Sequence, residues 1–237
     1  MSGGWDESAG AWIAAQGERG DWGRAHVIDT AMLGRVDGRG FRTALDVGCG
    51  EGRFCRMLRQ RGIDVIGIDP TAALLEEARR RDPRGDYRHG RAETLEFEDG
   101  RFDLVVSYLT LIDIQDFRAA IAEMARVLRP GGSLLIANIT SFVSPCVGDG
   151  WIKDENGRYL HFRVDRYLDE FPQWVEWCGI RIENWHRPLS AYMRALLENG
   201  LALKFFEEPE PGGDDPARAA LYRRVPWFLV MEWSKPQ

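Results

Sequence analysis

Three glycines at alternate positions mark the part of the chain where chemistry can be expected. Gly48, Gly50 and Gly52 come directly after a short apolar run, residues 43–47, whose composition suits a buried parallel strand. Residues 53–61 then show apolar side chains at helical spacing. A strand, a glycine turn and a helix bring bare backbone and a helix N-terminus close to a bound ligand. A glycine turn alone is a weak indication, so its meaning depends on the residues further along the chain.

An acidic residue stands at an informative distance from this turn. Asp69 ends the apolar run 63–68 and lies about 20 residues beyond Gly48, where an acidic side chain can accept both hydroxyls of a ribose. The same carboxylate would also suit the start of the helix that Thr71 is expected to cap, and the sequence leaves that alternative open. Together, the strand, the turn and the acid predict a site for a nucleoside cofactor.

The spacing of the glycines distinguishes two kinds of cofactor. Dinucleotide folds use G-x-G-x-x-G, in which the second glycine admits a pyrophosphate. Here the order is Gly48-x-Gly50-x-Gly52, preceded by Asp46 and Val47. This pattern resembles motif I of the class I S-adenosylmethionine-dependent methyltransferases, whose ligand carries no phosphate.

The resemblance continues along the chain over roughly residues 42–140. Residues 67–70 are similar to the family's ribose-binding strand end, and residues 90–97 resemble its adenine-contacting loop. Residues 102–107 and 128–132 resemble its fourth and fifth strand regions. Several ordered motifs make this match much more specific than one glycine turn.

The resemblance implies S-adenosylmethionine as the cofactor and a set of residues that bind it. These residues are Asp46, Gly48, Cys49, Gly50, Asp69, Pro70, Ala92, Glu93 and Tyr108. One departure concerns the adenine loop, where the family often has an acidic residue that accepts from the adenine amino group. This chain has Arg91 there, which cannot accept a hydrogen bond. We therefore expect the Ala92 backbone and Glu93 to contact the adenine, with Arg91 facing solvent or stacked.

Methyl transfer from a sulfonium is an in-line displacement, so the protein chiefly aligns donor and acceptor and excludes water. A general base is needed only if the acceptor is protonated, as a hydroxyl is. The catalytic candidates are Tyr108 and Asp113, which come after the fourth strand, and His186, which is favoured because histidine titrates near neutrality. For each of them a structural hydrogen bond is the alternative.

The elements that must position these residues alternate between strand and helix. The expected strands are 43–47, 63–68, 86–89, 102–107, 133–139, 201–206 and 227–233. Helical periodicity, clearest at 117–128, separates them and favours right-handed crossovers in an α/β fold. With the family's pattern, this predicts a doubly wound, Rossmann-like, mostly parallel seven-stranded sheet whose last strand is antiparallel. Residues 207–219 are expected to form a charged loop.

Two segments flank this pattern within what we expect to be a single domain, residues 1–237. Residues 1–40 carry helical periodicity and are expected to form an N-terminal helical cap. Residues 141–187, between strand five and the next helix, are expected to form a lid. The tryptophans of this insertion would either form its own small core or contact a flat, partly apolar acceptor.

Composition narrows the classes of partner. The formal net charge of −6 and the pI near 5.4 argue against nucleic acid, and the strand end 107–110 lacks the Asn/Asp-Pro-Pro-aromatic motif of enzymes that methylate planar nitrogens. No apolar run of about 18 residues and no signal-like N-terminus is present, so we expect neither a membrane span nor export. The four cysteines lack metal-ligand spacing, which favours a reduced, cytoplasmic protein without a metal site.

The leading hypothesis is therefore S-adenosylmethionine-dependent methylation of a small-molecule acceptor, most simply at oxygen or nitrogen. One alternative is a non-catalytic module that binds S-adenosylmethionine. A second, which the glycine spacing disfavours, is a nicotinamide-dependent oxidoreductase. The identity of the acceptor is left open.

Overall fold

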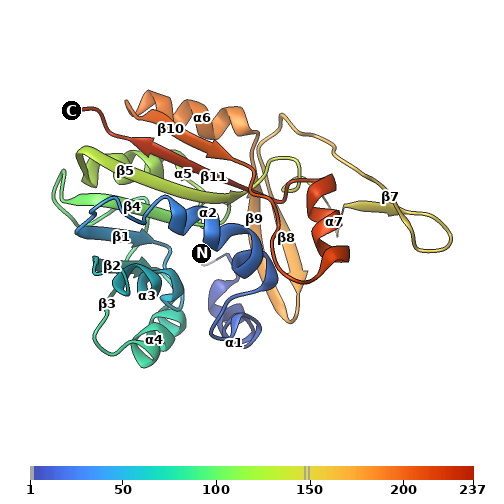
Figure 1. Cartoon of the computed structure of the whole chain (residues 1–237), viewed down its shortest axis with the longest axis horizontal. Coiled ribbons are helices and arrows are strands. Elements are labelled where there is room, and N and C mark those ends of the chain that lie inside the picture. Colours follow the sequence, from blue (N-terminus) through green and yellow to red (C-terminus); the bar gives the residue numbers. More distant parts are fainter. Residues whose placement is uncertain (1–2, 147, 149) are drawn as a thin grey trace.

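A seven-stranded sheet forms the centre of the computed structural model, which describes residues 3–146, 148 and 150–237 (Figure 1). In spatial order its strands are β10 (Ala202–Glu207), β11 (Phe228–Ser234), β5 (Leu128–Ile139), β4 (Phe102–Tyr108), β1 (Thr43–Val47), β2 (Asp64–Asp69) and β3 (Asp86–His89). Strand β11 runs antiparallel to both of its neighbours, whereas all other neighbours pair in parallel. The predicted sheet, with its antiparallel last strand, is confirmed.

Helices cover both faces of this sheet. The helices of the described residues are α1 (Trp5–Gln16), the short π-helix η1 (Arg24–Ile28), α2 (Asp29–Gly34), α3 (Arg53–Arg59), α4 (Ala72–Arg81), α5 (Phe117–Val127), α6 (Leu189–Glu198) and α7 (Pro216–Arg224); α1 packs beside the sheet and not on one of its faces. Strand β4 shows why its sequence is continuously apolar. Val105 packs toward α5 and α6, whereas Leu104 and Val106 pack toward η1, α2 and α3. Both sides of the strand are buried, as is usual for a central parallel strand.

The carboxyl ends of β1, β2 and β4 meet at one edge of the sheet because these strands are parallel and adjacent. Residue Val47 pairs with Ile68, so the glycine turn begins beside the end of β2. The backbone N–H groups of Gly48 and Cys49 both donate to the Ile68 carbonyl, at 2.8 and 2.9 Å. This pairing fixes the position of the turn relative to Asp69.

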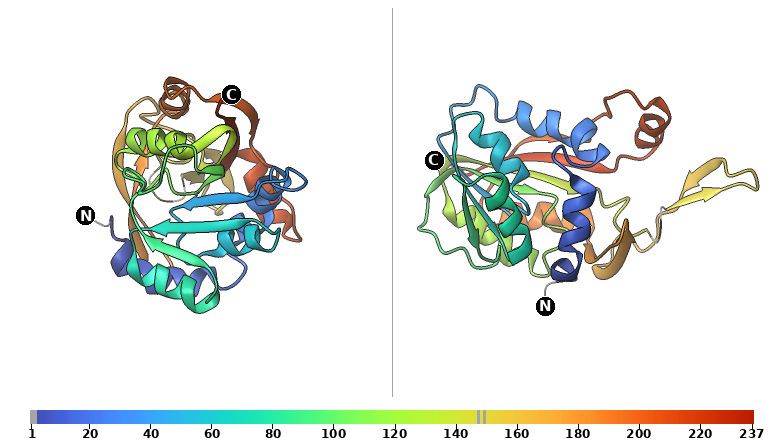
Figure 2. Two further views of the ribbon diagram at one scale, coloured as in Figure 1. Left: turned by 90° about the vertical axis from the view of Figure 1, so that its left-hand side faces the viewer. Right: turned by 90° about the horizontal axis from the view of Figure 1, so that it is seen from below.

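The insertion after β5 folds as two antiparallel hairpins. The first comprises β6 (Trp151–Lys153) and β7 (Tyr159–Phe162) and projects from the rest of the molecule (yellow in Figure 2). The second comprises β8 (Phe171–Trp177) and β9 (Ile180–His186).

Strand β9 packs against the N-terminal helix α1. Ala9 and Trp12 of α1 form a small core with Ile180, Ile182 and Leu74, which links the N-terminal segment, the insertion and α4. Two segments far apart in sequence therefore support each other beside the sheet. Among the described residues, no helix combines the length and apolarity that a membrane crossing requires.

Helix α7 begins within the segment expected to be a charged loop, residues 207–219; residues 208–215 form no helix or strand, whereas the expectation is wrong for the last four residues. The carboxylate of Asp215 caps the helix by accepting from the Arg218 backbone N–H at 2.9 Å, and Pro216 occupies the first turn. Few of its residues are buried, so apolar periodicity gave little indication of it.

Candidate active site

The glycine turn at the end of β1 is shaped by backbone conformation and by close packing. Gly48, Gly50 and Gly52 have φ values of 75°, 54° and 74°, in the left-handed region that favours glycine. A Cβ atom on Gly48 would lie 2.2 Å from Thr110, and one on Gly52 would lie 2.6 Å from the ring of Tyr87. At Gly50 nothing lies within 4 Å of that position. The middle of the turn therefore faces open space, which leaves room for a ligand.

The Asp69 carboxylate is fixed against this turn. It is 7% exposed and accepts hydrogen bonds from the backbone N–H groups of Gly50, at 3.0 Å, and Thr71, at 2.8 Å. Burial raises the pKa of this carboxyl. A carboxylate offers about four acceptor positions, so lone pairs remain for other donors. The hydrogen bond to Thr71 gives Asp69 the helix-starting role that the sequence left open, and ribose recognition stays compatible with it.

A second acid, Asp46, is buried among the cysteines of this region. It is 1% exposed, and its Oδ2 accepts from the Cys55 thiol at 3.2 Å, whereas its Oδ1 has no hydrogen-bond partner. Burial raises the pKa of Asp46 to about 7 and that of the buried Cys49 thiol to about 11. An unpartnered buried carboxylate oxygen is costly. This atom therefore has acceptor capacity that no hydrogen-bond donor of the described residues fills.

The loop after β3 holds the residues expected to contact an adenine. Ala92 is buried, and the Glu93 carboxylate forms an ion pair with Arg91 at 2.9 Å. The Arg91 side chain is 55% exposed and faces solvent. Because Arg91 engages the Glu93 carboxylate, the backbone of Ala92 is the freer of the two expected adenine contacts. Pro70, at the end of β2, is exposed.

Tyr108 ends β4 and joins a buried polar network. Its hydroxyl donates to Asp29 at 2.8 Å, and Asp29 also forms a buried ion pair with Arg53. Burial and the Asp29 charge hold the pKa of Tyr108 well above its usual range. The hydroxyl therefore stays protonated, which makes Tyr108 a poor proton acceptor while leaving its ring at the end of β4.

Asp113 lies five residues beyond Tyr108 and carries a carboxyl group whose pKa is raised by its surroundings. It is half-buried, and its Oδ1 accepts from the side-chain amide of Asn184 on β9. Burial raises the pKa of Asp113 to about 8; the negative charge of Asp69 adds to this, whereas Arg24 and Arg187 oppose it. Asp113 therefore lies within electrostatic reach of the Asp69 end of the sheet.

His186 was the favoured candidate for a general base, but the structure places it in a buried position with both ring nitrogens hydrogen-bonded. It has no exposed surface; its Nδ1 lies 2.7 Å from the Ser144 hydroxyl and its Nε2 lies 3.0 Å from the Tyr167 carbonyl. A carbonyl only accepts, so Nε2 carries the proton and Nδ1 accepts from Ser144. Burial lowers the pKa of His186. Both ring nitrogens of neutral His186 are therefore hydrogen-bonded within the protein. This agrees with the alternative that His186 makes a structural hydrogen bond and is not a base.

Two arginines that the sequence did not single out support the site. Arg24 lies over the ring of Trp12 at 4.7 Å and near that of Tyr108 at 5.9 Å, and it pairs with Asp21. The indole N–H of Trp12 donates to Glu51 of the glycine turn at 3.4 Å. The N-terminal helices are thus connected to the end of β4 and to the turn.

The second arginine that supports the site is Arg187, which is 1% exposed. Its guanidinium donates to the carbonyls of Leu111, Ile114 and Gln115, at 3.0, 2.6 and 2.9 Å, and lies 4.4 Å from the centre of the Phe117 ring. It therefore fixes the backbone of the loop that carries Asp113. Its partners are main-chain atoms, which every residue has, so no sequence spacing could reveal this contact.

Replacing Arg187 by methionine should lower the free energy of unfolding by about 3–5 kcal/mol, because two buried carbonyls and a partly buried one would lose their donor. Urea unfolding of both proteins measures the difference. Arg194→Met is the matched control, because Arg194 is an exposed residue of α6, and it should leave the unfolding midpoint nearly unchanged. A loss below about 1 kcal/mol at Arg187 would contradict this role.

Among the described residues, no group of histidine, cysteine, aspartate and glutamate side chains is arranged to hold a metal ion. The polar groups at this edge instead suit an organic ligand. The left-handed turn, the fixed Asp69 carboxylate and the unpartnered Asp46 oxygen provide acceptors and bare backbone at this edge.

Comparison with known proteins agrees with this geometry. A family model described as a methyltransferase domain matches residues 45–136. A malonyl-[acyl-carrier protein] O-methyltransferase of Serratia marcescens is 32% identical over 154 residues, which are 65% of this chain and 58% of that protein. A demethylmenaquinone methyltransferase of Renibacterium salmoninarum is 33% identical over 128 residues, 54% of this chain and 52% of that protein. The chain spans about half the length of the curated relatives it matches.

A solved structure extends the similarity beyond the matched segment. An S-adenosylmethionine-dependent methyltransferase from Mesorhizobium loti superposes with a TM-score of 0.76 at 27% identity, covering 86% of this chain and 96% of that one. Fold, glycine turn and relatives lead to the same result as the motifs in the sequence. Residues 45–136 form a methyltransferase domain, and the chain has the fold of the class I S-adenosylmethionine-dependent methyltransferases.

Proposed function

We propose that this protein transfers the methyl group of S-adenosylmethionine to a small-molecule acceptor, most simply at an oxygen atom. The observation that carries the proposal is the Asp69 carboxylate, fixed beside an open left-handed glycine turn. A relative named as an O-methyltransferase supports oxygen as the atom methylated. The acidic protein favours an acceptor other than nucleic acid.

The donor would be held by residues from the carboxyl ends of four strands. Asp69 would accept from the ribose, the Ala92 backbone and Glu93 would contact the adenine, and Asp46 would accept from a polar group of the ligand. The remaining proposed contacts are Gly48, Cys49, Gly50, Pro70 and Tyr108. The bound donor supplies the methyl group as a sulfonium, and the chain's own residues align the acceptor and exclude water.

The surroundings of the site would complete this enclosure. We propose that the N-terminal helices, within residues 1–40, cap the edge through the contacts of Trp12 and Arg24. The insertion, residues 141–187, would act as the lid of the same single domain. Asn184 of this insertion already reaches Asp113, which brings it to the end of β4.

Asp113 is the residue we propose as general base toward a hydroxyl acceptor. A base must be unprotonated, and the pKa of this carboxyl is about 8 in the protein without ligand. Neither His186 nor Tyr108 has a free acceptor atom of this kind, so both are proposed to support the site structurally. Asn184 orients the carboxylate and, by donating to it, favours the charged form.

The proposed base gives the pH profile a definite direction. With a hydroxyl acceptor, kcat/KM should rise with pH and level off above about 8, because Asp113 is protonated below its pKa. The profile of kcat should level off at lower pH, since a bound sulfonium favours the carboxylate. Initial rates from pH 6 to 9 would test this, and rates that do not rise over that interval would contradict it.

A transfer assay tests the proposed function itself. Purified protein is incubated with methyl-labelled S-adenosylmethionine and pools of small hydroxyl, amine and carboxylate compounds, and labelled products are separated. We expect labelled product in at least one pool, with S-adenosylhomocysteine formed in equal amount. Cofactor binding without any product would favour a non-catalytic module, and binding of NAD in place of S-adenosylmethionine would favour an oxidoreductase.

A further inference from the structure

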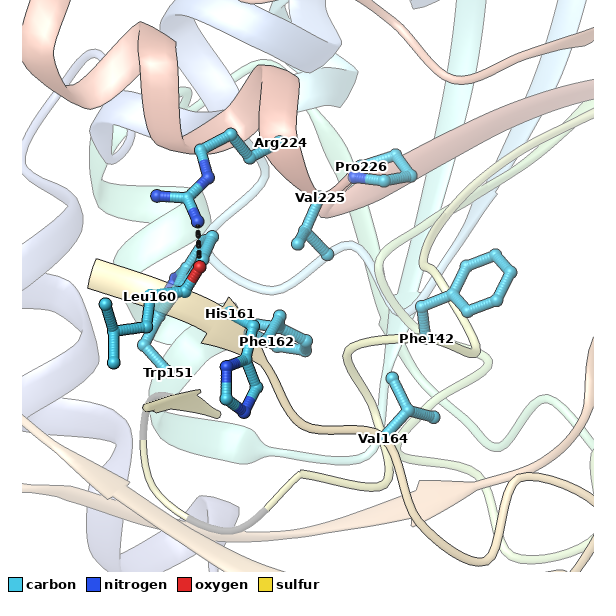
Figure 3. Close-up of a pocket in the computed structure, with 9 residues that line it drawn as sticks. All are labelled: Phe142, Trp151, Leu160, His161, Phe162, Val164, Arg224, Val225 and Pro226. Carbon is cyan, nitrogen blue, oxygen red and sulfur yellow. Dashed lines mark hydrogen bonds between the residues drawn. The ribbon is translucent and has the colours of Figure 1, made fainter. Parts of the chain in front are cut away.

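A pocket outside the proposed donor site lies between the β6–β7 hairpin and the connection from α7 to β11 (Figure 3). It is an open pocket with a volume of about 450 Å³, within the range of small-molecule sites. Most of its walls are apolar and come from three separate segments. They include Phe142, Leu160, Phe162, Val164, Val225 and Pro226.

The pocket lies at the same edge of the sheet as the proposed donor site. Thr140, directly after β5, donates through its backbone N–H to the Trp227 carbonyl and through its hydroxyl to the Pro226 carbonyl, at 3.0 and 2.6 Å. The end of β5 is two strands from the end of β1, a distance of roughly 10 Å at about 4.8 Å per strand. A molecule that extends from the pocket to the glycine turn would have to span more than this distance, because the pocket lies beyond the end of β5.

The side chains around the pocket are unusually exposed for their type. Phe142 is 46% exposed, Leu160 is 50% exposed and Val164 is 40% exposed. Exposed apolar groups gathered at a concave site are typical of a binding surface. The ring of Phe142 also lies 5.5 Å from that of Tyr167, whose carbonyl accepts from His186 at the end of β9. Tyr167 thus connects Phe142 of the pocket with His186, on the same strand as Asn184.

Arg224, which lines the pocket, is hydrogen-bonded to the β6–β7 hairpin. Arg224 donates to the carbonyls of Tyr159 and Leu160, at 3.0 and 2.7 Å, and its guanidinium lies 4.6 Å from the centre of the Trp151 ring. It joins the hairpin to α7, as the dashed bond to Leu160 in Figure 3 shows. These contacts hold the guanidinium against the hairpin, and the walls that an uncharged group would bury are apolar.

We propose that this pocket binds the uncharged hydrocarbon portion of the methyl acceptor, while the reacting atom extends to Asp113. This inference rests on the proposed methyl transfer and adds the acceptor class: a molecule with a substantial hydrocarbon part and a polar group to be methylated. Binding would bury Phe142, Leu160 and Val164, so affinity should increase with the length of the hydrocarbon.

Calorimetry with hexanol, octanol and decanol tests the pocket without knowledge of the acceptor. The full chain is first saturated with S-adenosylhomocysteine. Affinity should rise about threefold to fourfold for each added methylene. Leu160→Asp should weaken octanol binding by at least about tenfold, because it places a charge in the pocket wall. Leu168→Asp is the matched control, since Leu168 is 79% exposed and does not line the pocket, and it should bind octanol like the unaltered protein.

Each result separates the pocket from the proposed function. Equal octanol binding by the Leu160→Asp protein, or affinity that does not depend on chain length, would overturn the inference while S-adenosylhomocysteine binding still upheld the donor site. Loss of S-adenosylhomocysteine binding in the unaltered protein would instead contradict the proposed function, and the alkanol series would still report on the pocket. If sedimentation showed a dimer that Leu160→Asp dissociates, a second copy would occupy this surface and the inference would fail.

Discussion

Asp113→Asn is expected to lower the rate of methyl transfer to a hydroxyl acceptor by about 10²–10⁴-fold. Asparagine keeps the size and can keep a hydrogen bond to Asn184, but it cannot take the proton. Cofactor affinity should change little, because Asp113 is not among the proposed donor contacts. Steady-state rates above pH 8, where the carboxylate is charged in the unaltered protein, give the comparison its largest range.

The same loop offers a control for this substitution. Asp116→Asn makes the same chemical change three residues later, where the side chain caps α5 by accepting from the Ala119 N–H at 3.0 Å. Asparagine caps helices nearly as well as aspartate, so this protein should retain its activity.

Asn184→Ala should shift the rise of kcat/KM to higher pH, because the lost hydrogen bond favoured the charged carboxylate. A fully active Asp113→Asn protein would remove Asp113 from the mechanism.

Asp69→Ala is expected to weaken the binding of S-adenosylhomocysteine by about 100-fold. The carboxylate would make two charge-assisted hydrogen bonds to the ribose, each of roughly 1.5 kcal/mol or more, and a factor of ten corresponds to about 1.4 kcal/mol. The substitution also removes the acceptor of the Gly50 and Thr71 N–H groups, which loosens the turn. Isothermal titration calorimetry measures the two affinities directly.

Asp64→Ala provides the comparison, since Asp64 begins the same strand but is exposed at its opposite end. The affinity of the Asp64→Ala protein for S-adenosylhomocysteine should equal that of the unaltered protein. Thermal unfolding of both variants separates lost binding from lost folding. Equal affinities in the Asp69→Ala and unaltered proteins would exclude the ribose assignment.

Local sequence patterns were sufficient to predict most of the fold, because each helix or strand is determined largely by residues close together in the sequence. The run before Gly48, the acidic end of β2 and the periodicity of α5 each depend on neighbours within a few residues. Parallel β–α units then leave few possible topologies, and the seven-stranded order is one of them. Helix α7 was missed for the same reason, because a largely exposed helix has no apolar stripe to reveal it.

The environment of each candidate catalytic residue depended on contacts between distant parts of the chain. His186 suited a base by residue type, yet Ser144 and Tyr167 enclose both of its nitrogens in the fold. Burial raises the pKa of Asp113, and Asn184, a residue 71 positions away, opposes that rise by donating to the carboxylate. Burial and hydrogen-bond partners, which set a pKa, are properties of the assembled structure.

The sequence by itself determined the donor side of this protein: the glycine turn, the acid at the end of β2 and the sheet that brings them together. Their geometry is encoded locally, by left-handed glycines and by the alternation of strand and helix. Only the tertiary structure decided what surrounds them. It placed Arg187 under the Asp113 loop through main-chain carbonyls and formed an apolar pocket from three distant segments. Contacts of that kind arise from packing and leave no periodic mark in the chain.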